Sequence, residues 1–569
     1  MTVFILGAGI MQIPAIRAAQ ELGWFAAAAD ANALAPGASV ADRFVHVDLK
    51  DLDGLLAAAR GLREERGLDA VFTAGTDFSA AVAWLAERLD LPGIPYDAAL
   101  RASDKLRMRA AFEAAGLASP RFTAVEAGAD PAAAIAAAGL DLPLVVKPAD
   151  SMGARGCRLV RSPAELDDAC ARALGHSRSA RAIVEEYMDG PEFSLDALVA
   201  DGEVMIRGFA DRHIRFSPYF IEVGHTMPTA FPRDICDEVA RVFTAGVRAL
   251  GITRGAAKGD MKWSAARECA MIGEIAARLS GGYMSGWTYP YASGIDVTKG
   301  ALELAAGRAP AVSVADRGWV SAERAFISIP GRVSRLVGLR DAESLPFIKN
   351  LFTRVAPGDD CVFPSNNVEK CGNVIAQAPD RETAIAAAEA AIRGIIVRLE
   401  AGREETEAFL RGTAACGTVV SGNASGGDGL SLIRNPDGTT WPPEAFDLPP
   451  RLCAVIDALP DAFVIADDDQ DLDGGPLVLA LSPECGLDGW GGQDWSGRGF
   501  AESAELALRL AGGRFVDHER SGKGPAGASR EKGGGRRVLA ARFWKALARG
   551  GAQAALYVLD TADQGGGPT

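Results

Sequence analysis

Residues 255–282 read GAAKGDMKWSAARECAMIGEIAARLSGG, which predicts two short strands joined by the polar turn SAARE. Because side chains alternate along a strand, Lys258, Asp260 and Lys262 share one face of the first strand. The first strand is therefore expected to present a charged face.

The second strand of this hairpin carries Glu274, Ala276 and Arg278 on one face. Paired positions in an antiparallel hairpin have a constant sum, so a turn centred on Arg267 places Asp260 opposite Glu274. Two facing carboxylates with an arginine close by suit a magnesium ion that carries phosphate oxygens. A solvated strand face with a salt bridge explains the hairpin alone equally well, so the choice depends on the rest of the chain.

The composition predicts a globular protein of several domains. The 569 residues suffice for about four domains of about 150 residues each. Hydrophobic residues make up 48% of the chain, and the formal net charge of −15 argues against general nucleic-acid binding. The nine cysteines form no CxxC pair, as expected of reduced thiols. We find no signal-peptide pattern and no apolar run of about 18 residues, so a cytoplasmic protein without membrane contact is expected.

Residues 1–102 predict a small parallel α/β domain in which strands and helices alternate. Gly7 and Gly9 match the start of a dinucleotide-binding fingerprint, and Asp30 lies about where a ribose-binding acid would fall. The third glycine position is Gln12, however. We therefore favour a structural turn between strand and helix, with NAD binding as a minor alternative.

Two lysines lie at positions that favour a buried or bound anion. Ser103 is predicted to cap a helix that ends at Gly116, which puts Lys105 in its first turn, where a lysine gains nothing from the helix dipole. Lys147 ends the apolar strand LPLVVKP, which Pro148 stops. Solvent-exposed or snorkelling lysines are the alternative for both.

The segment ADSMGARGC, which follows Lys147, is a glycine-rich loop with Ser151, Gly153 and Gly156. Glycines let a backbone approach a phosphate, and successive N–H groups can bind an anion. The Walker pattern GxxxxGK[ST] is absent, so the loop alone is a weak signal.

Two further strands, AIVEEYM and EFSLDALVA, carry acidic residues. Glu185 and Glu186 lie near the end of the first, while Glu192, Ser194 and Asp196 share one face of the second. Glu185, Glu186 and Glu192 could be surface charges, but the position of these three residues after the lysine strand and the glycine-rich loop favours nucleotide contacts.

The series of elements from residue 1 to about residue 400 resembles the ATP-grasp superfamily, in which ATP lies between two α+β lobes. The resemblance implies contacts to the phosphates, the adenine and the ribose of ATP. The phosphate contacts are assigned to Lys105, Lys147 and the loop residues Ser151, Gly153 and Gly156. The adenine contacts are assigned to Glu185, Glu186, Tyr187 and Met188, with the backbone of the last three reading the base. The ribose contact is assigned to Glu192.

The same resemblance implies that Asp260 and Glu274 bind the metal and that Arg278 lies near the transferred phosphoryl group. Lys262 and His225 complete the residues expected to take part in catalysis. Many members have E-x-N at the second metal strand, whereas this chain has Glu274 followed two positions later by alanine. The run EIAxR resembles the purine-pathway carboxyaminoimidazole ribonucleotide synthase branch, where alanine also occurs, so the number of metal ions stays open.

The substrate side of the site is less clearly marked. The segment DRHIRF and the loop after it supply Arg212, Arg215 and His225, which are expected to bind an acidic group or to assist proton transfer. A histidine that only packs in a loop is an equally good interpretation. Aromatic residues of the segment LSGGYMSGWTYPY indicate either a pocket wall or a packed turn: Tyr283, Trp287 and Tyr289.

The predicted fold is a multidomain α/β and α+β protein. It consists of a Rossmann-like pre-ATP-grasp domain (1–102), a two-lobed ATP-grasp nucleotide-binding and catalytic domain (103–312), a strand-rich closing lobe (313–402) and an additional C-terminal α/β domain (403–569) of unassigned role. The closing lobe resembles that of biotin-carboxylase-like and purine-pathway members.

The resemblance predicts an ATP-dependent ligase that activates a small carboxylate as an acyl phosphate and joins it to an amine, releasing ADP and phosphate. The expected cofactors are ATP and Mg²⁺, with Mn²⁺ as an alternative, and the expected partners are small-molecule carboxylate and amine substrates and a second copy of the chain in a homodimer. A bicarbonate-activating carboxylase and a non-catalytic ATP-binding regulator are the alternatives.

Overall fold

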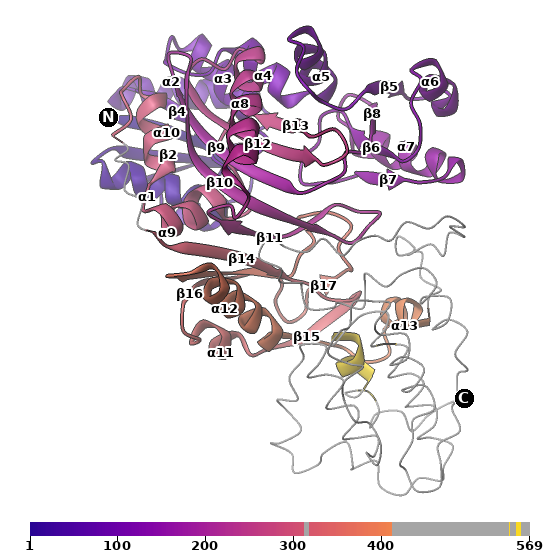
Figure 1. Ribbon diagram of the computed structural model, residues 1–569. Coiled ribbons are helices and arrows are strands. Elements are labelled where there is room, and N and C mark those ends of the chain that lie inside the picture. Colours follow the sequence, from indigo (N-terminus) through magenta and orange to yellow (C-terminus); the bar gives the residue numbers. More distant parts are fainter. Residues whose placement is uncertain (312–317, 412–545, 547–552, 559–560, 562–569) are drawn as a thin grey trace, which may run out of the picture. The chain divides into compact units, whose positions relative to one another are not determined.

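The computed structural model describes residues 1–311, 318–411, 546, 553–558 and 561. The chain divides into two compact units, which we describe separately (Figure 1). Unit 1 comprises Met1–Ile214, Gly224–Glu323 and Ala376–Ile385, and unit 2 comprises Arg215–Val223, Arg324–Ile375 and Ala386–Thr569. The predicted C-terminal domain (403–569) lies almost wholly outside the described residues. Within the described residues, no helix is long and apolar enough to cross a membrane.

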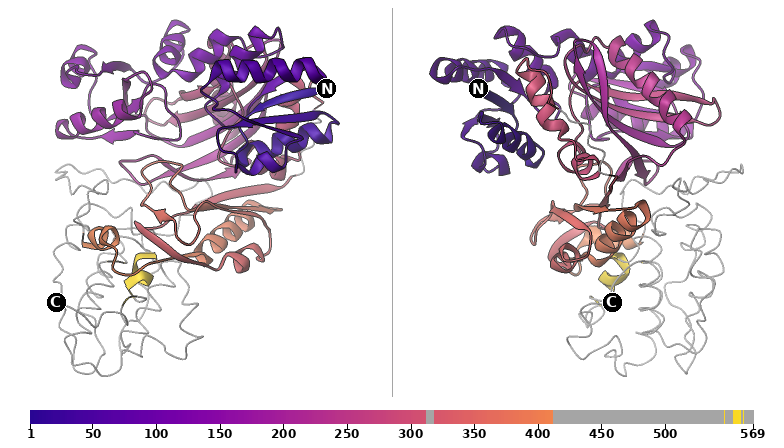
Figure 2. Two further views of the ribbon diagram at one scale, coloured as in Figure 1. Left: turned by 180° about the vertical axis from the view of Figure 1, so that it is seen from behind. Right: turned by 60° about the vertical axis from the view of Figure 1, so that its left-hand side comes forward.

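The N-terminal part of unit 1 is a parallel sheet with the strand order β3-β2-β1-β4, drawn in indigo and violet in Figure 2. Its elements are β1 (Thr2–Leu6), α1 (Ile13–Glu21), β2 (Phe25–Asp30), β3 (Arg43–His46), α2 (Leu52–Arg66), β4 (Ala70–Phe72), α3 (Ser79–Arg88) and α4 (Tyr96–Ser103). These elements confirm the predicted alternation of strands and helices.

The polar residues of the first turn are used within this sheet. The Asp30 carboxylate accepts a hydrogen bond from the Ala8 N–H at 2.8 Å, so it closes the glycine turn after β1. The Gln12 side chain donates a hydrogen bond to the Ala74 carbonyl and accepts one from the Ala74 N–H, just after β4. These contacts support the structural interpretation of the turn over a dinucleotide site.

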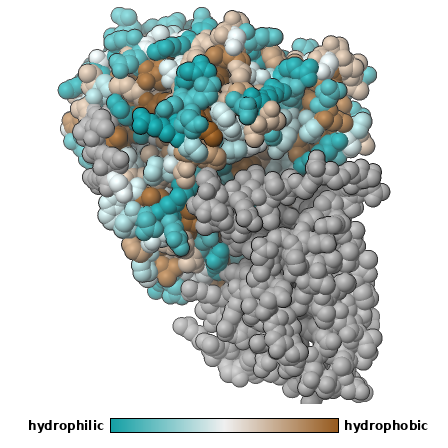
Figure 3. Space-filling view, in the orientation of Figure 1, coloured by the Kyte–Doolittle hydropathy of each residue, from teal (hydrophilic) through white to brown (hydrophobic). Residues whose placement is uncertain are grey.

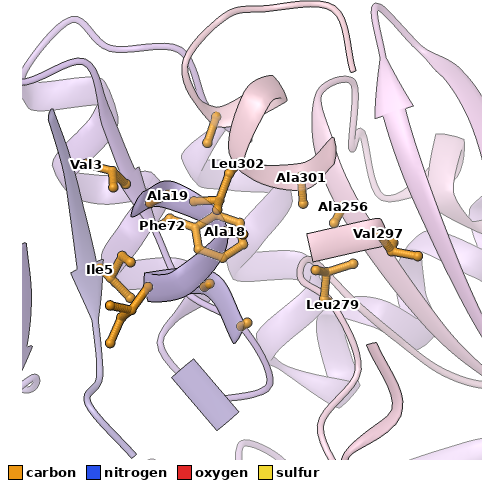
Figure 4. Packing of buried hydrophobic residues seen from close by; sticks show 14 of the residues in the cluster. Val3, Ile5, Ala18, Ala19, Phe72, Ala256, Leu279, Val297, Ala301 and Leu302 are labelled. Atoms are coloured by element: carbon orange, nitrogen blue, oxygen red, sulfur yellow. The ribbon is translucent and has the colours of Figure 1, made fainter. Parts of the chain in front are cut away.

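A buried apolar cluster joins the N-terminal sheet to a helix far away in the sequence, α10 (Val297–Ala305). Figure 4 shows Ala18 and Ala19 of α1 with Leu302 of α10 and Phe72 of β4. The small alanines let the two helices approach closely, and burial of this apolar surface stabilises the sheet against α10. The visible face of unit 1 mixes hydrophilic and hydrophobic residues over short distances (Figure 3), as is usual for a globular surface.

A second sheet of unit 1 has the strand order β5-β8-β6-β7 and is antiparallel between the paired strands. Its elements are β5 (Phe122–Glu126), α6 (Pro131–Ala137), β6 (Leu144–Pro148), β7 (Arg158–Val160), α7 (Leu166–His176) and β8 (Arg181–Glu186). In Figure 1 this sheet lies beside α6 and α7 at the end of unit 1 that is remote from the N-terminus.

Helix α5 (Lys105–Ala114) precedes the sheet formed by β5, β6, β7 and β8. Asp104, not Ser103, caps it, because the Asp104 carboxylate accepts hydrogen bonds from the N–H groups of Leu106 and Arg107. Ser103 instead ends α4, and its hydroxyl donates to the Ala99 carbonyl. The predicted cap was therefore wrong by one residue, although Lys105 does lie in the first turn.

The third sheet has the strand order β13-β12-β9-β10-β11-β14-β18-β16, and every strand except β16 (Ile348–Thr353) lies wholly or partly in unit 1. Its other strands are β9 (Glu192–Ala200), β10 (Glu203–Arg215), β11 (Ile221–Met227), β12 (Gly255–Ser264), β13 (Cys269–Ala276), β14 (Val320–Phe326) and β18 (Gly372–Ala378). Strands β10, β11, β14 and β18 each continue into unit 2. The turn Ala265–Glu268 between β12 and β13 is the predicted polar turn.

Helix α8 (Arg233–Ala249) covers one face of β12 and β13 (Figure 1). Alternation along β12 directs Ala257, Gly259 and Met261 to this face. A Cβ on Gly259 would lie 2.5 Å from the Phe243 ring of α8, so only glycine allows this close approach. The charged residues of β12 consequently face away from α8.

Unit 2 contains a small sheet in the order β17-β15-β19 and its own apolar core. Its elements are β15 (Gly331–Val337), α11 (Leu339–Glu343), β16 (Ile348–Thr353), β17 (Asp360–Cys361), the last residues of α12 (Arg381–Gly394), β19 (Ile396–Leu399) and α13 (Glu404–Arg411). Residues 554–558 join this core, which places one described part of the C-terminal region in unit 2.

Candidate functional site

The central feature of the site is the pairing of β12 with β13, which places Asp260 opposite Glu274 as predicted. The pairing has a β-bulge: Asp260 pairs with Glu274, whereas the next residue, Met261, pairs with Ile272. Gly273 is therefore the extra residue of the bulge. Its carbonyl oxygen accepts a hydrogen bond from the Arg109 guanidinium at 2.6 Å.

The bulge decides which face of the sheet Glu274 occupies. The pairs nearest the turn, such as Ser264 with Cys269, follow a register that would place Glu274 opposite Gly259. Gly259 faces α8, so a regular hairpin would direct Glu274 into the apolar core. The one-residue bulge moves Glu274 to the face of Asp260, and two carboxylates meet there.

Cations surround these two carboxylates. Lys258 forms an ion pair with Asp260, and the Arg212 Nε lies 3.6 Å from the Asp260 Oδ1. The Lys105 Nζ lies 3.8 Å from the Glu274 Oε2. Burial opposes ionisation of Glu274, but Lys105 and the other nearby lysines outweigh it and hold the pKa of Glu274 below its usual value. Glu274 therefore stays charged at neutral pH.

The donor set fits a magnesium ion that is shared with phosphate. Within the described residues, no group of three or more carboxylate, histidine or cysteine side chains forms a complete metal cage. Mg²⁺ usually takes one or two protein carboxylates and completes its coordination with phosphate oxygens and water. Asp260 and Glu274 supply that number. The register places Ala276 opposite Lys258, so a lysine rather than a third ligand lies beside Asp260.

A buried triad holds the second predicted phosphate lysine. The Lys147 Nζ lies 2.6 Å from the Glu185 Oε2, and the Arg109 Nε lies 2.7 Å from the Glu185 Oε1. Glu185 and Arg109 are each 1% exposed. Burial raises the pKa of Glu185, but Arg109 and Lys147 outweigh it and lower the pKa to about 2. Glu185 therefore orients Lys147 with its side chain.

Arg109 is a site residue that the sequence prediction missed. It follows Lys105 by four positions in α5, so both side chains lie on the same face of the helix. Arg109 joins α5 to Glu185 of β8 and to the Gly273 carbonyl of the bulge. The i, i+4 spacing from Lys105 was the signal that could have identified it.

The glycine-rich loop lies against the same charged face. Its Ser151 carbonyl accepts a hydrogen bond from the Lys105 Nζ at 2.6 Å. Gly153 and Gly156 have positive φ angles of 69° and 66°, which explains why glycine stands at both positions. Arg155 of this loop forms an ion pair with Asp77, at 3.1 Å, in the segment after β4. The loop therefore contacts both α5 and the N-terminal part of unit 1.

Arg278 follows β13 and is 8% exposed. Its Nη1 donates to the Leu279 carbonyl at 2.8 Å, and its Nη2 lies 3.4 Å from the Met152 sulfur in the glycine-rich loop. No described carboxylate lies within ion-pair distance of this guanidinium. A buried guanidinium without a carboxylate partner in the described chain is suited to an anionic ligand.

The residues of the predicted base and ribose contacts also lie together. The Lys262 Nζ is 2.8 Å from the Glu192 Oε1 and donates to the Met188 carbonyl at 2.9 Å. It also lies 5.2 Å from the centre of the Tyr187 ring. The Arg212 Nη1 lies 2.7 Å from the other oxygen of Glu192. Lys262 therefore contacts the residues predicted to bind the base and the ribose, whereas the sequence had grouped it with Arg278.

The peptide N–H groups at the end of β8 are partly engaged. The Glu186 N–H donates to the Arg121 carbonyl at 3.0 Å, and the Tyr187 N–H donates to the Pro143 carbonyl at 3.2 Å. The Glu186 carboxylate accepts hydrogen bonds from Arg121 and Arg267. These contacts fix the backbone on which the predicted base contacts depend.

Other residues from the sequence prediction are buried in the protein. His225 and Glu323 are each 1% exposed, and the His225 Nδ1 lies 2.9 Å from the Glu323 Oε2. Tyr283 and Tyr289 are 2% and 0% exposed, which favours the packed turn over a pocket wall. Arg215 belongs to unit 2.

Comparisons with known proteins identify the domain families that the chain resembles. Residues 140–286 match the ATP-grasp domain family, and residues 325–400 match the family described as L-amino acid ligase C-terminal domain 2. The chain is similar to the uncharacterized protein y4rH of Sinorhizobium fredii, with 25% identity over 353 residues, 61% of this chain and 72% of that protein.

It is also similar to the alanine–anticapsin ligase of Bacillus subtilis, with 28% identity over 237 residues. That alignment covers 38% of this chain and 49% of the ligase, so the chain spans about half the length of this relative. Among solved structures, the L-amino acid ligase from Bacillus licheniformis has a TM-score of 0.60 and 19% identity, covering 70% of this chain and 98% of that chain.

Residues 140–286 therefore form an ATP-grasp domain, as the sequence predicted, and the chain has the fold of the Bacillus licheniformis ligase. Its domain architecture is L-amino acid ligase-like, because residues 325–400, which follow the ATP-grasp match, match the C-terminal domain 2 of that family. The predicted fold class is confirmed for the described residues.

Proposed function

We propose that the protein is an ATP-dependent ligase that activates the carboxylate of an amino acid as an acyl phosphate and joins it to an amine. The observation that carries the proposal is the pair of facing carboxylates, Asp260 and Glu274, bordered by Lys105, Lys258 and the buried Arg278. This arrangement provides carboxylates for a metal and separate cations for phosphate oxygens on one face of the sheet.

In this proposal the phosphates of ATP lie against Lys105, Lys147 and the glycine-rich loop. The triad with Glu185 keeps Lys147 charged and oriented, because burial lowers the pKa of Lys147 but the neighbouring carboxylate outweighs it. Glu192 binds the ribose. Burial raises the pKa of Glu192, but Lys262 and Arg212 outweigh it, so the carboxylate is charged and ready to accept hydrogen bonds.

The backbone at Glu186, Tyr187 and Met188 reads the adenine. The N–H groups of Glu186 and Tyr187 already donate to protein carbonyls. We therefore assign the base contacts to the remaining peptide groups of this segment, the Glu186 carbonyl and the Met188 N–H among them. Lys262 holds the segment by its bond to the Met188 carbonyl.

Magnesium held by Asp260 and Glu274 would neutralise phosphate charge, which is the main requirement of phosphoryl transfer. The substrate carboxylate attacks the γ-phosphorus, and the bond to the β-phosphate oxygen breaks, so ADP leaves. The amine then attacks the carbonyl carbon of the acyl phosphate, loses a proton and expels phosphate. Arg278 stabilises the charge on the transferred phosphoryl group in both steps.

An amino acid is proposed as the carboxylate substrate because of the L-amino acid ligase domain match at residues 325–400. The same match favours ligation over activation of bicarbonate. His225 is assigned no contact with substrate, because its side chain is buried against Glu323. The homodimer and the number of metal ions stay predictions.

The test is ADP release from MgATP in the presence of single amino acids and of pairs, with product masses measured by mass spectrometry. The expected result is release that needs a pair, and a product whose mass is that of both substrates less one water. Glu274→Ala should abolish it, whereas Glu268→Ala, an exposed residue in the turn of the same hairpin, should not.

Three outcomes would contradict the proposal. Stimulation by bicarbonate alone would indicate a carboxylase. Tight ATP binding without turnover in any pool would indicate a regulator. Equal activity of both glutamate variants would reject the metal assignment.

A further inference from the structure

A second polar row lies beside the metal carboxylates and has no role in the proposed reaction so far. The register pairs residues of β9 with residues of β12 as follows: Glu192 with Lys262, Ser194 with Asp260 and Asp196 with Lys258. Glu192 and Asp260 already have proposed roles. Asp196, in contrast, is completely buried, with 0% exposure.

Asp196 is anchored to the segment that follows Arg278. One oxygen, Oδ1, accepts hydrogen bonds from both the N–H and the hydroxyl of Ser280, at 3.0 and 2.7 Å. Burial raises the pKa of Asp196 to about 6, although these two hydrogen bonds act in the opposite direction. A buried carboxylate is costly unless its partners compensate, so its presence in the middle of a sheet calls for a reason.

The same peptide group connects Asp196 to Arg278. The peptide bond between Leu279 and Ser280 offers its N–H to Asp196, while its carbonyl accepts a hydrogen bond from the Arg278 Nη1 at 2.8 Å. Because a peptide group is planar and rigid, fixing its N–H end also fixes the direction of its carbonyl. Aligned hydrogen bonds of this kind also polarise one another.

Other contacts hold the surrounding segment in place. Gly281 approaches Gly75 so closely that a Cβ on Gly75 would lie 3.0 Å from the Gly281 Cα. The Tyr289 ring lies against Gly208, the residue paired with Asp196 on β10, and its hydroxyl donates to the Ser194 carbonyl at 3.0 Å. The backbone after Arg278 therefore packs against Gly75, and Tyr289 packs against the strands that flank and carry Asp196.

We propose that Asp196 is a positioning residue: through the Leu279–Ser280 peptide it orients the guanidinium of Arg278 toward the transferred phosphoryl group. This inference rests on the proposed function, because the role of Arg278 is part of that proposal. Asp196 itself touches neither ATP nor substrate.

The test compares Asp196→Ala, Asp196→Asn and Ser280→Ala in steady-state kinetics. A misplacement of about 1 Å at a reacting group costs about 100-fold in rate, so Asp196→Ala should lower kcat by about 100-fold. The KM for ATP should change little, because Lys105 and Lys147 are untouched. Asp196→Asn keeps an oxygen that accepts both bonds and should lose less than about tenfold, which corresponds to one hydrogen bond.

Ser194→Ala is the matched control. Ser194 lies in the same buried row, two positions before Asp196, and its hydroxyl has no hydrogen-bond partner in the described residues. Ser194→Ala removes one buried hydroxyl, as Ser280→Ala does, but it leaves the hydrogen bonds of the Leu279–Ser280 peptide group unchanged. Wild-type kcat is expected for this variant, and reduced kcat for Ser280→Ala.

A double-mutant cycle with Arg278→Ala separates positioning from a merely structural role. If Asp196 acts through Arg278, the loss in the double variant should be close to that of Arg278→Ala alone. Additive losses, or a loss confined to the KM for ATP, would overturn the inference. If Asp196→Ala does not fold, the cycle is run with Ser280→Ala.

Failure of this inference and failure of the proposed function are distinguishable. A wild-type protein that turns over ATP with a pair of substrates, together with additive losses, refutes only the role of Asp196. A wild-type protein without turnover refutes the ligase proposal itself.

Discussion

Glu185→Gln should be one of the most destabilising single substitutions in unit 1, while Glu186→Gln, the same change at the next residue, should cost little. Glu185 is 1% exposed and pairs with Lys147 and Arg109. Glu186 pairs with Arg121, whose side chain is 56% exposed. The two variants thus compare a fully buried ion pair with one whose arginine is exposed to solvent, at adjacent positions of one strand.

The magnitude follows from the lowered pKa of Glu185. Its pKa falls from the ordinary 4.5 to about 2, a difference of about 2.5, and each pKa unit corresponds to about 1.4 kcal/mol. Ionised Glu185 therefore contributes roughly 3 kcal/mol at neutral pH. Removal of one partner from a buried pair costs about 3–5 kcal/mol in other proteins, which agrees. An exposed pair contributes about 0–1 kcal/mol.

The assay is thermal unfolding, followed at the transition that MgATP raises, because that transition reports the nucleotide-binding unit. At about 2 °C per kcal/mol, Glu185→Gln should lower Tm by about 6–10 °C and Glu186→Gln by about 2 °C or less. Equal shifts for the two variants would refute the reasoning about the buried triad.

The pH dependence supplies a second check on the same pair of proteins. Because the folded pKa of Glu185 is lowered, its contribution is present above the ordinary value of 4.5 and is lost as the pH falls toward 2. The difference in Tm between wild type and Glu185→Gln should therefore stay constant from about pH 7 to about pH 5 and narrow below that. A difference that widens toward acid pH would contradict the sign of this shift.

Other substitutions test the metal and phosphate side of the site. Gly273→Ala puts a Cβ 2.7 Å from the Asp260 carbonyl oxygen, so the bulge must shift; we expect a higher Mg²⁺ concentration for half-maximal turnover, measured by Mg²⁺ titration. Arg278→Lys should lower kcat by at least about tenfold, because a lysine does not reproduce the planar fork; kcat at the wild-type value would reject that role. Lys147→Ala should abolish turnover while the circular dichroism spectrum stays that of the wild type; normal turnover would reject its phosphate role.

Much of the fold was predictable because local sequence patterns indicate the helices, strands and turns. The strands and helices of residues 1–102 follow from periodicity, and the turn at Asp201 and Gly202 follows from their tolerance of positive φ angles, observed as 50° and 82°. The face shared by Lys258, Asp260 and Lys262 likewise follows from alternation. These are short-range signals, and the structure agrees with them.

The contacts of the site that depend on distant segments were not predictable in the same way. Glu185 was expected to contact the nucleotide, yet its carboxylate binds Arg109 and Lys147, which come from two other elements. The pair Asp77–Arg155 joins residues that are far apart in the sequence. One chain without aligned relatives contains no signal for which acidic residue neutralises which cation.

The bulge at Gly273 shows how a correct local prediction can depend on a feature that the sequence did not reveal. A regular hairpin centred on Arg267 gives the observed pairing of Asp260 with Glu274, but the strands leave the turn in a register shifted by one residue. The extra residue Gly273 shifts the register back by one position between Met261 and Asp260, so that Asp260 pairs with Glu274. Arg109 donates to the Gly273 carbonyl and to Glu185, which in turn holds Lys147. The position of Glu274, the proposed metal ligand, and the orientation of Lys147, the proposed phosphate lysine, are therefore linked through Arg109. A substitution at Arg109 should disturb both at once.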